Sequence, residues 1–115
     1  MTTNLILVID IHGTIDQTGL ERLRSHLGLA KQGRLSDDYD QGFGYRKIEI
    51  GAGQRINVGL YRQFDGSWIL DASTRTADVG PEVLTRLRAE LIDGIAAAGY
   101  EAVVRPKPTF GTSNR

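Results

Sequence analysis

The chain has 115 residues, enough for one domain of ordinary size. Its 14 lysine and arginine residues balance 14 aspartate and glutamate residues, so the net charge gives no general attraction to nucleic acid or acidic lipid. The absence of cysteine excludes disulfide scaffolds, thiolate zinc sites and cysteine nucleophiles.

The N-terminal part of the sequence predicts a strand followed by a short helix. Leu5–Ile11 is apolar on both faces, which is typical of a central strand covered on at least one side. The spacing of Thr18 and Glu21 predicts a capping box that begins a helix. Gly28 is expected to end this helix. Three leucines at helical spacing form its predicted buried stripe: Leu20, Leu23 and Leu27.

The segment Lys31–Gly44 has no hydrophobic periodicity, and we expect it to form a long loop that carries function. Its acidic and aromatic residues suit contact with a basic protein partner. We predict a partner-binding site made of Asp37, Asp38, Tyr39, Asp40 and Phe43. Asp38, Asp40 and Glu49 also have the spacing of calcium-loop ligands, but Phe43 stands where such a loop needs glycine, so we expect no metal.

The middle of the chain predicts a meander of three antiparallel strands. They cover Tyr45–Ile50, Arg55–Gln63 and Trp68–Ala72, where apolar and polar residues alternate. Asp65-Gly66 predicts a two-residue type I′ turn between the second and third strands. The outward face mixes polar and apolar side chains, which suits an interface, and self-association through it is the first hypothesis. These outward residues are Asn57, Tyr61, Ile69 and Asp71.

The C-terminal part predicts a second helix and a last strand. The helix opens at Asp78–Glu82, with Pro81 in the first turn, and ends at Gly99. Its apolar stripe consists of Leu84, Leu87, Leu91, Ile95 and Ala98. Tyr100–Arg105 reads as a short strand, and residues 106–115 as a flexible tail.

The element order is therefore β-α-β-β-β-α-β, which predicts one two-layer α+β domain over residues 1–105. We expect a mainly antiparallel sheet with both helices on one face. A ferredoxin-like variant, with the first and last strands in the centre, is compatible with this order.

One alternative function is catalytic and uses Asp10 and His12. Their i, i+2 spacing places both side chains on one face of the first strand, as an acid–base pair of a small hydrolase or isomerase would require. Asp10-Ile11-His12-Gly13-Thr14 resembles the first motif of haloacid-dehalogenase-type phosphotransferases, Asp-x-Asp-Gly-Thr. His12 replaces the second aspartate of that motif, so we do not expect phosphotransferase activity.

A non-enzymatic protein-binding module is the function that the sequence favours. Four arginines and several aromatic residues in the meander suggest RNA binding, but the aromatic strand motif of RNA-recognition domains is absent and the net charge is neutral. We therefore expect a protein partner, no nucleic acid, no membrane and no cofactor. The module is either a self-associating regulatory domain or a small bacterial antagonist of the immunity or inhibitor type, located in the cytoplasm.

Overall fold

The computed structural model describes residues 4–37, 41–51, 54–75 and 79–106. These residues form two helices and six strands. In chain order they are β1 Asn4–His12, α1 Gln17–Leu27, β2 Ala30–Lys31, β3 Gly42–Gly51, β4 Gln54–Arg62, β5 Trp68–Thr74, α2 Pro81–Ala97 and β6 Glu101–Val104.

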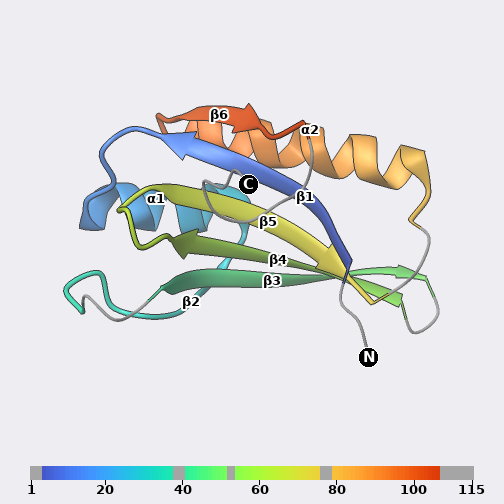
Figure 1. The fold of residues 1–115 in the computed structure, drawn as a ribbon, viewed down its shortest axis with the longest axis horizontal. Coiled ribbons are helices and arrows are strands. Elements are labelled where there is room, and N and C mark those ends of the chain that lie inside the picture. The colour runs from blue at the N-terminus through green and yellow to red at the C-terminus, as the bar shows by residue number, and fades with distance from the viewer. Residues whose placement is uncertain (1–3, 38–40, 52–53, 76–78, 107–115) are drawn as a thin grey trace.

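The six strands form one sheet in the order β2-β3-β4-β5-β1-β6, and every neighbouring pair is antiparallel (Figure 1). This confirms the predicted α+β class. β1 lies inside the sheet as expected, but β6 forms an edge, so the ferredoxin-like placement of the last strand is wrong. The meander β3-β4-β5 brings β5 to one side of β1, and only the outer side of β1 is left for β6.

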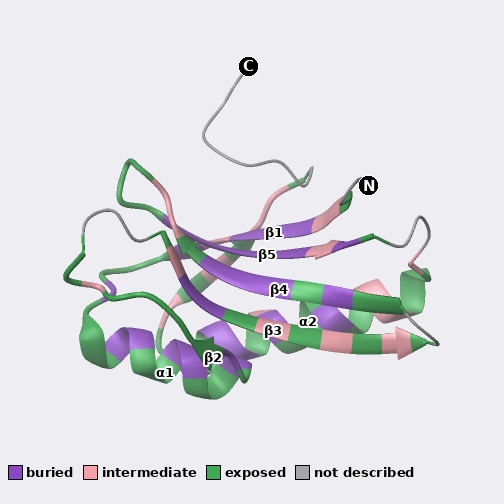
Figure 2. Ribbon diagram, turned by 90° about the horizontal axis from the view of Figure 1, so that it is seen from below, coloured by how far each residue is buried: buried purple, intermediate pink, exposed green. Residues whose placement is uncertain are grey.

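Both helices pack on the same face of the sheet (Figure 2). The core between the layers contains the predicted stripe of α1 and most of that of α2, with Leu87, Leu91, Ile95 and Ala98 buried. Leu84 is only partly buried at its border. None of the described helices has the length and apolar character needed to cross a membrane.

Local signals set the helix ends, although one of them was misassigned. Helix α1 begins one residue after Asp16, whose Oδ1 accepts a hydrogen bond from the Gly19 amide at 2.7 Å. The predicted cap at Thr18 is therefore wrong, because Thr18 already lies within the helix. Gly28 ends α1 in the left-handed conformation (φ 68°), as predicted.

The hairpin between β4 and β5 forms where Asp65-Gly66 predicted it, but with a different turn. The Gln63 amide donates to the Ser67 carbonyl at 2.8 Å, and the Gly66 amide donates to the Gln63 carbonyl at 2.9 Å. Only Gly66 of the loop has positive φ (88°), so the turn cannot be type I′, which requires positive φ at two central residues.

The polar segment after α1 is more structured than expected. β2 begins at Ala30, and β3 already begins at Gly42, so strands take up both ends of the predicted loop. The buried Arg24 of α1 ties the two ends together. Its Nε donates to the Phe43 carbonyl at 2.8 Å, and its Nη2 donates to the Gln32 carbonyl at 2.7 Å.

Candidate functional site

The candidate site lies on the face of the sheet that is turned away from α1 and α2, which we call the distal face. Strand register places Gly59 of β4 opposite Tyr45 of β3 and Asp71 of β5. Two residues before Gly59 in β4, Asn57 lies opposite Lys47 of β3 and Ser73 of β5. Residues directly opposite in an antiparallel ladder point to the same side. On β3, β4 and β5 the members of the distal face are therefore Tyr45, Lys47, Asn57, Gly59, Tyr61, Ile69, Asp71 and Ser73. On β1, Val8 lies opposite Asp71 and Asp10 opposite Ile69, so both point to the same side.

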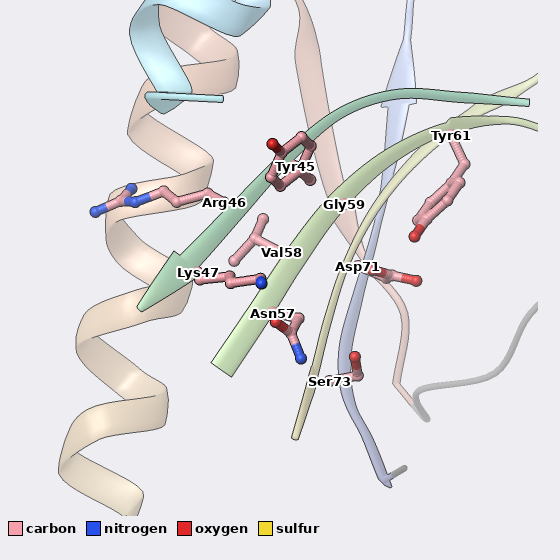
Figure 3. Close-up of a pocket in the computed structure, with 9 residues that line it drawn as sticks. All are labelled: Tyr45, Arg46, Lys47, Asn57, Val58, Gly59, Tyr61, Asp71 and Ser73. Carbon is pink, nitrogen blue, oxygen red and sulfur yellow. The ribbon is translucent and has the colours of Figure 1, made fainter. Parts of the chain in front are cut away.

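This face is hollowed above Gly59, over a volume of about 190 Å³ (Figure 3). The hollow is lined by Tyr45, Arg46, Lys47, Asn57, Val58, Gly59, Tyr61, Asp71 and Ser73. Its walls combine aromatic rings, one carboxylate, neutral polar groups and the two cationic residues Arg46 and Lys47. It is thus suited to a ligand with both an apolar body and a polar end.

Gly59 makes room for the ring of Tyr61, which lines the hollow, because it has no side chain. A Cβ atom at this position would lie 2.5 Å from the Tyr61 ring, which is closer than real Cβ contacts allow. The ring of Tyr61 therefore lies over the glycine, and its hydroxyl end points toward Asp71 (Figure 3). Tyr61 remains 38% exposed, and Tyr45 remains 48% exposed.

Asp71 is the most unusual group of the distal face. It is only 5% exposed, and burial raises its pKa to about 7, although a hydrogen bond from the backbone of Gly59 opposes this shift. No lysine or arginine of the described chain forms an ion pair with it. The pKa of Tyr61 is raised by burial and by the negative charge of Asp71.

Asp10, predicted to form an acid–base pair with His12, is paired with Arg105 instead. Arg105 donates from Nε and Nη2 to the two oxygens of Asp10, at 2.8 and 2.7 Å. This ion pair raises the pKa of Arg105. His12 is exposed at the end of β1, and neither residue lines the hollow above Gly59. Asp10 therefore holds Arg105, the residue that follows β6, against β1.

The four polar and aromatic residues from Asp37 to Asp40, predicted to bind a partner, are only partly described by the structure. Asp38, Tyr39 and Asp40 lie outside the described residues. Asp37 is described, and its backbone carbonyl accepts a hydrogen bond from Arg62 Nη2 at 2.8 Å.

Phe43 does not have the exposed ring that a place in the predicted partner-binding site would require. It is fully buried, with its ring centroid 5.0 Å from that of Trp68 and the Arg62 guanidinium 4.8 Å from its centre. The register shift between Gly42 and Gly44 accommodates Phe43, and the Arg24 hydrogen bond to its carbonyl holds it there. The expectation of an exposed Phe43 is therefore wrong.

A metal site is not evident in the described part of the chain, where no three His, Asp or Glu side chains gather closely enough to hold an ion. Glu49, considered above as a calcium ligand, lies in β3 and pairs with Arg55 at 3.6 Å. Comparison with known proteins found no matching family model, curated protein or solved structure.

Part of the distal face was predicted from alternation alone. Asn57 and Tyr61 point outward and are exposed, as expected. Ile69 and Asp71 belong to the same face but are buried. Tyr45, Lys47, Gly59 and Ser73 were not singled out, although the same alternation along their strands would have identified them.

Proposed function

We propose that the protein is a non-enzymatic binding module whose distal face takes up a basic side chain of a protein partner at Asp71. The observation that carries this proposal is the buried carboxylate of Asp71, which has no cationic partner among the described residues, beside a hollow lined by tyrosines.

Burial of an unpaired carboxylate disfavours its charged form, which is why the pKa of Asp71 is raised. A guanidinium or ammonium group placed in the hollow would stabilise that charge and supply hydrogen-bond donors. The binding free energy would therefore come partly from relieving an unfavourable feature of the free protein.

The rest of the hollow is also compatible with a cationic side chain. The half-exposed rings of Tyr45 and Tyr61 can pack against the aliphatic stem of such a residue and attract its charge through cation–π contact. Asn57 and Ser73 offer neutral oxygen acceptors in the same lining. Two lining residues are themselves cationic: Arg46 is paired with Glu90 of α2, and Lys47 sits opposite Asn57 rather than Asp71.

The size of the hollow favours a side chain of a larger partner over a free small molecule. Sites for drug-sized ligands usually enclose roughly 300–1,000 Å³ and bury most of the ligand. The hollow above Gly59 has about 190 Å³. A single anchoring arginine or lysine at the centre of a protein interface matches this volume and the composition of interface hot spots.

The catalytic alternative, a small hydrolase or isomerase, needs Asp10 free to exchange a proton with His12 or a substrate. The Asp10 carboxylate instead accepts two hydrogen bonds from Arg105. This arrangement supports a structural role for Asp10 and favours the binding module.

An NMR titration tests the proposal with N-acetyl-arginine methylamide as the probe and its neutral isostere, N-acetyl-citrulline methylamide, as the matched control. We expect the arginine probe to shift the amide signals of Gly59 and Asp71, with a dissociation constant in the millimolar range because one side chain makes few contacts. Affinity should rise about tenfold from about pH 6 to about pH 8, since only the ionised Asp71 attracts the cation.

Two charge-matched variants separate site binding from general attraction. Asp71→Asn should remove the shifts at Gly59, whereas Asp93→Asn, which removes an exposed carboxylate on α2, should leave them unchanged. Equal binding by Asp71→Asn and the unmodified protein, or equal shifts with the citrulline probe, would contradict the proposal.

A further inference from the structure

The outer edge of β3 is the second feature that points to a partner. β3 has ten residues, but β2 pairs with only two positions on its outer side, Gly44 and Tyr45. Within the described chain no strand pairs with the outer side of the segment from Arg46 to Gly51. An edge of this length presents unpaired backbone amide and carbonyl groups that another strand can satisfy.

The side chains along this edge are self-complementary. Lys47 and Glu49 are exposed on the distal face, while Ile48 and Ile50 are only half-buried on the core side. If a second copy of the same strand pairs antiparallel about a two-fold axis through Ile48, each Lys47 lies directly opposite Glu49 of the other copy. The two isoleucines at position 48 then lie opposite each other.

We propose that the β3 edge binds a second copy of this chain in that register. The sheets of the two copies then continue into one another, with two Lys47–Glu49 pairs across the axis. Opposite charges that lie directly across from each other stabilise a strand pair, and in a two-fold interface each contact occurs twice. This interface shares Lys47 with the lining of the hollow but makes no use of Asp71, so it does not depend on a basic side chain being bound there.

The length of the ladder sets the strength of the association. β2 occupies the outer side of Tyr45, so the paired segment extends only from Arg46 to Ile50. Its core-side residues also include Arg46, which is held by Glu90 of α2. We therefore expect a reversible dimer whose population rises with protein concentration, rather than an obligate one.

Cysteine cross-linking tests the register directly, because the natural chain has no cysteine. In the Ile48→Cys variant the two introduced thiols would face each other across the axis, within reach of a disulfide. We expect mild oxidation to yield a covalent dimer, seen on a non-reducing gel. The matched Ile50→Cys variant should cross-link far less, since position 50 lies opposite Arg46. Equal cross-linking of the two variants would overturn the proposed register.

Charge reversal tests the interface in solution by analytical ultracentrifugation. Lys47→Glu and Glu49→Lys should each weaken self-association about tenfold, because each variant places like charges opposite one another twice. An equimolar mixture of the two variants should recover a dimer, since every cross-axis pair is then of opposite sign.

Two control variants complete the design. Arg88→Glu, on the exposed side of α2, should leave association unchanged, and so should Asp71→Asn. Amide spectra would verify that each variant keeps its fold. A protein that stays monomeric up to millimolar concentration, or a mixture that stays monomeric, would contradict the proposal.

Discussion

Burial of Asp71 within the sheet makes the stability of the folded protein depend on pH. The pKa of Asp71 is about 7 in the folded protein, whereas an aspartate in an unfolded chain has a pKa of about 3.9. Between these values the folded protein holds a proton that the unfolded chain has lost. The contribution of Asp71 to stability is therefore fully present at low pH and is lost as the pH rises through about 7.

The Asp71→Asn variant should remove this pH dependence. Asparagine keeps the shape and can still accept the hydrogen bond from Gly59, but it cannot ionise. At about pH 8 we expect its free energy of unfolding to exceed that of the unmodified protein by roughly 2–4 kcal/mol, and at about pH 4 the two should be similar. Urea denaturation at both pH values measures the difference. A gain of the same size at both would show that the charge of Asp71 is not its cause.

At the scale of elements, helix α1 gives a test of which residue caps it. Asp16→Ala removes the hydrogen bond to the Gly19 amide and should lower the free energy of unfolding by about 1 kcal/mol. Thr18→Ala, within the first turn, should change it by less than about 0.5 kcal/mol. Chemical denaturation of the two variants compares them, and a larger loss for Thr18→Ala would support the capping box instead.

The elements that could be predicted from sequence are those set by neighbouring residues. Gly28 ends α1 because only a residue tolerant of positive φ fits there, and alternation of apolar residues places Ile56, Val58 and Leu60 in the core. The start of β3 could not be predicted in this way. It depends on Arg24, which lies far from Phe43 in the sequence and bonds to its carbonyl.

The candidate site was predictable to a similar extent. Alternation identified the faces of Tyr61 and Asp71, because strand periodicity is a local property. The burial of Asp71 was not predictable. The surroundings of Asp71 include Gly59 of β4 and Val8 of β1 on either side, and these depend on how three strands are aligned.

At the scale of the whole molecule, β1 is the one strand of the described residues that joins β6 to the sheet. β6 pairs with β1 over four positions, and Arg105 extends this contact through its ion pair with Asp10. Because this ion pair is largely shielded from solvent, it should contribute more than a pair at the surface.

Replacing Arg105 should therefore loosen this edge selectively. We expect Arg105→Gln to lower the free energy of unfolding by about 1–2 kcal/mol and to speed amide hydrogen exchange in β6, with little change in β3 and β4. Arg55→Gln, which breaks the exposed pair with Glu49, is the matched control and should have a small effect. Uniformly faster exchange throughout the sheet would contradict an edge-specific role.

The position of β1 between β5 and β6 also determines when the protein can finish folding during its synthesis. β1 is synthesised well before the strands with which it pairs: Asn4 pairs with Thr74, and Ile9 pairs with Val104. The hairpins of the meander need only nearby residues and can close earlier. The apolar strand β1 thus has no strand partner until β5 and β6 have been made, and nascent-chain aggregation or chaperone binding should concentrate there.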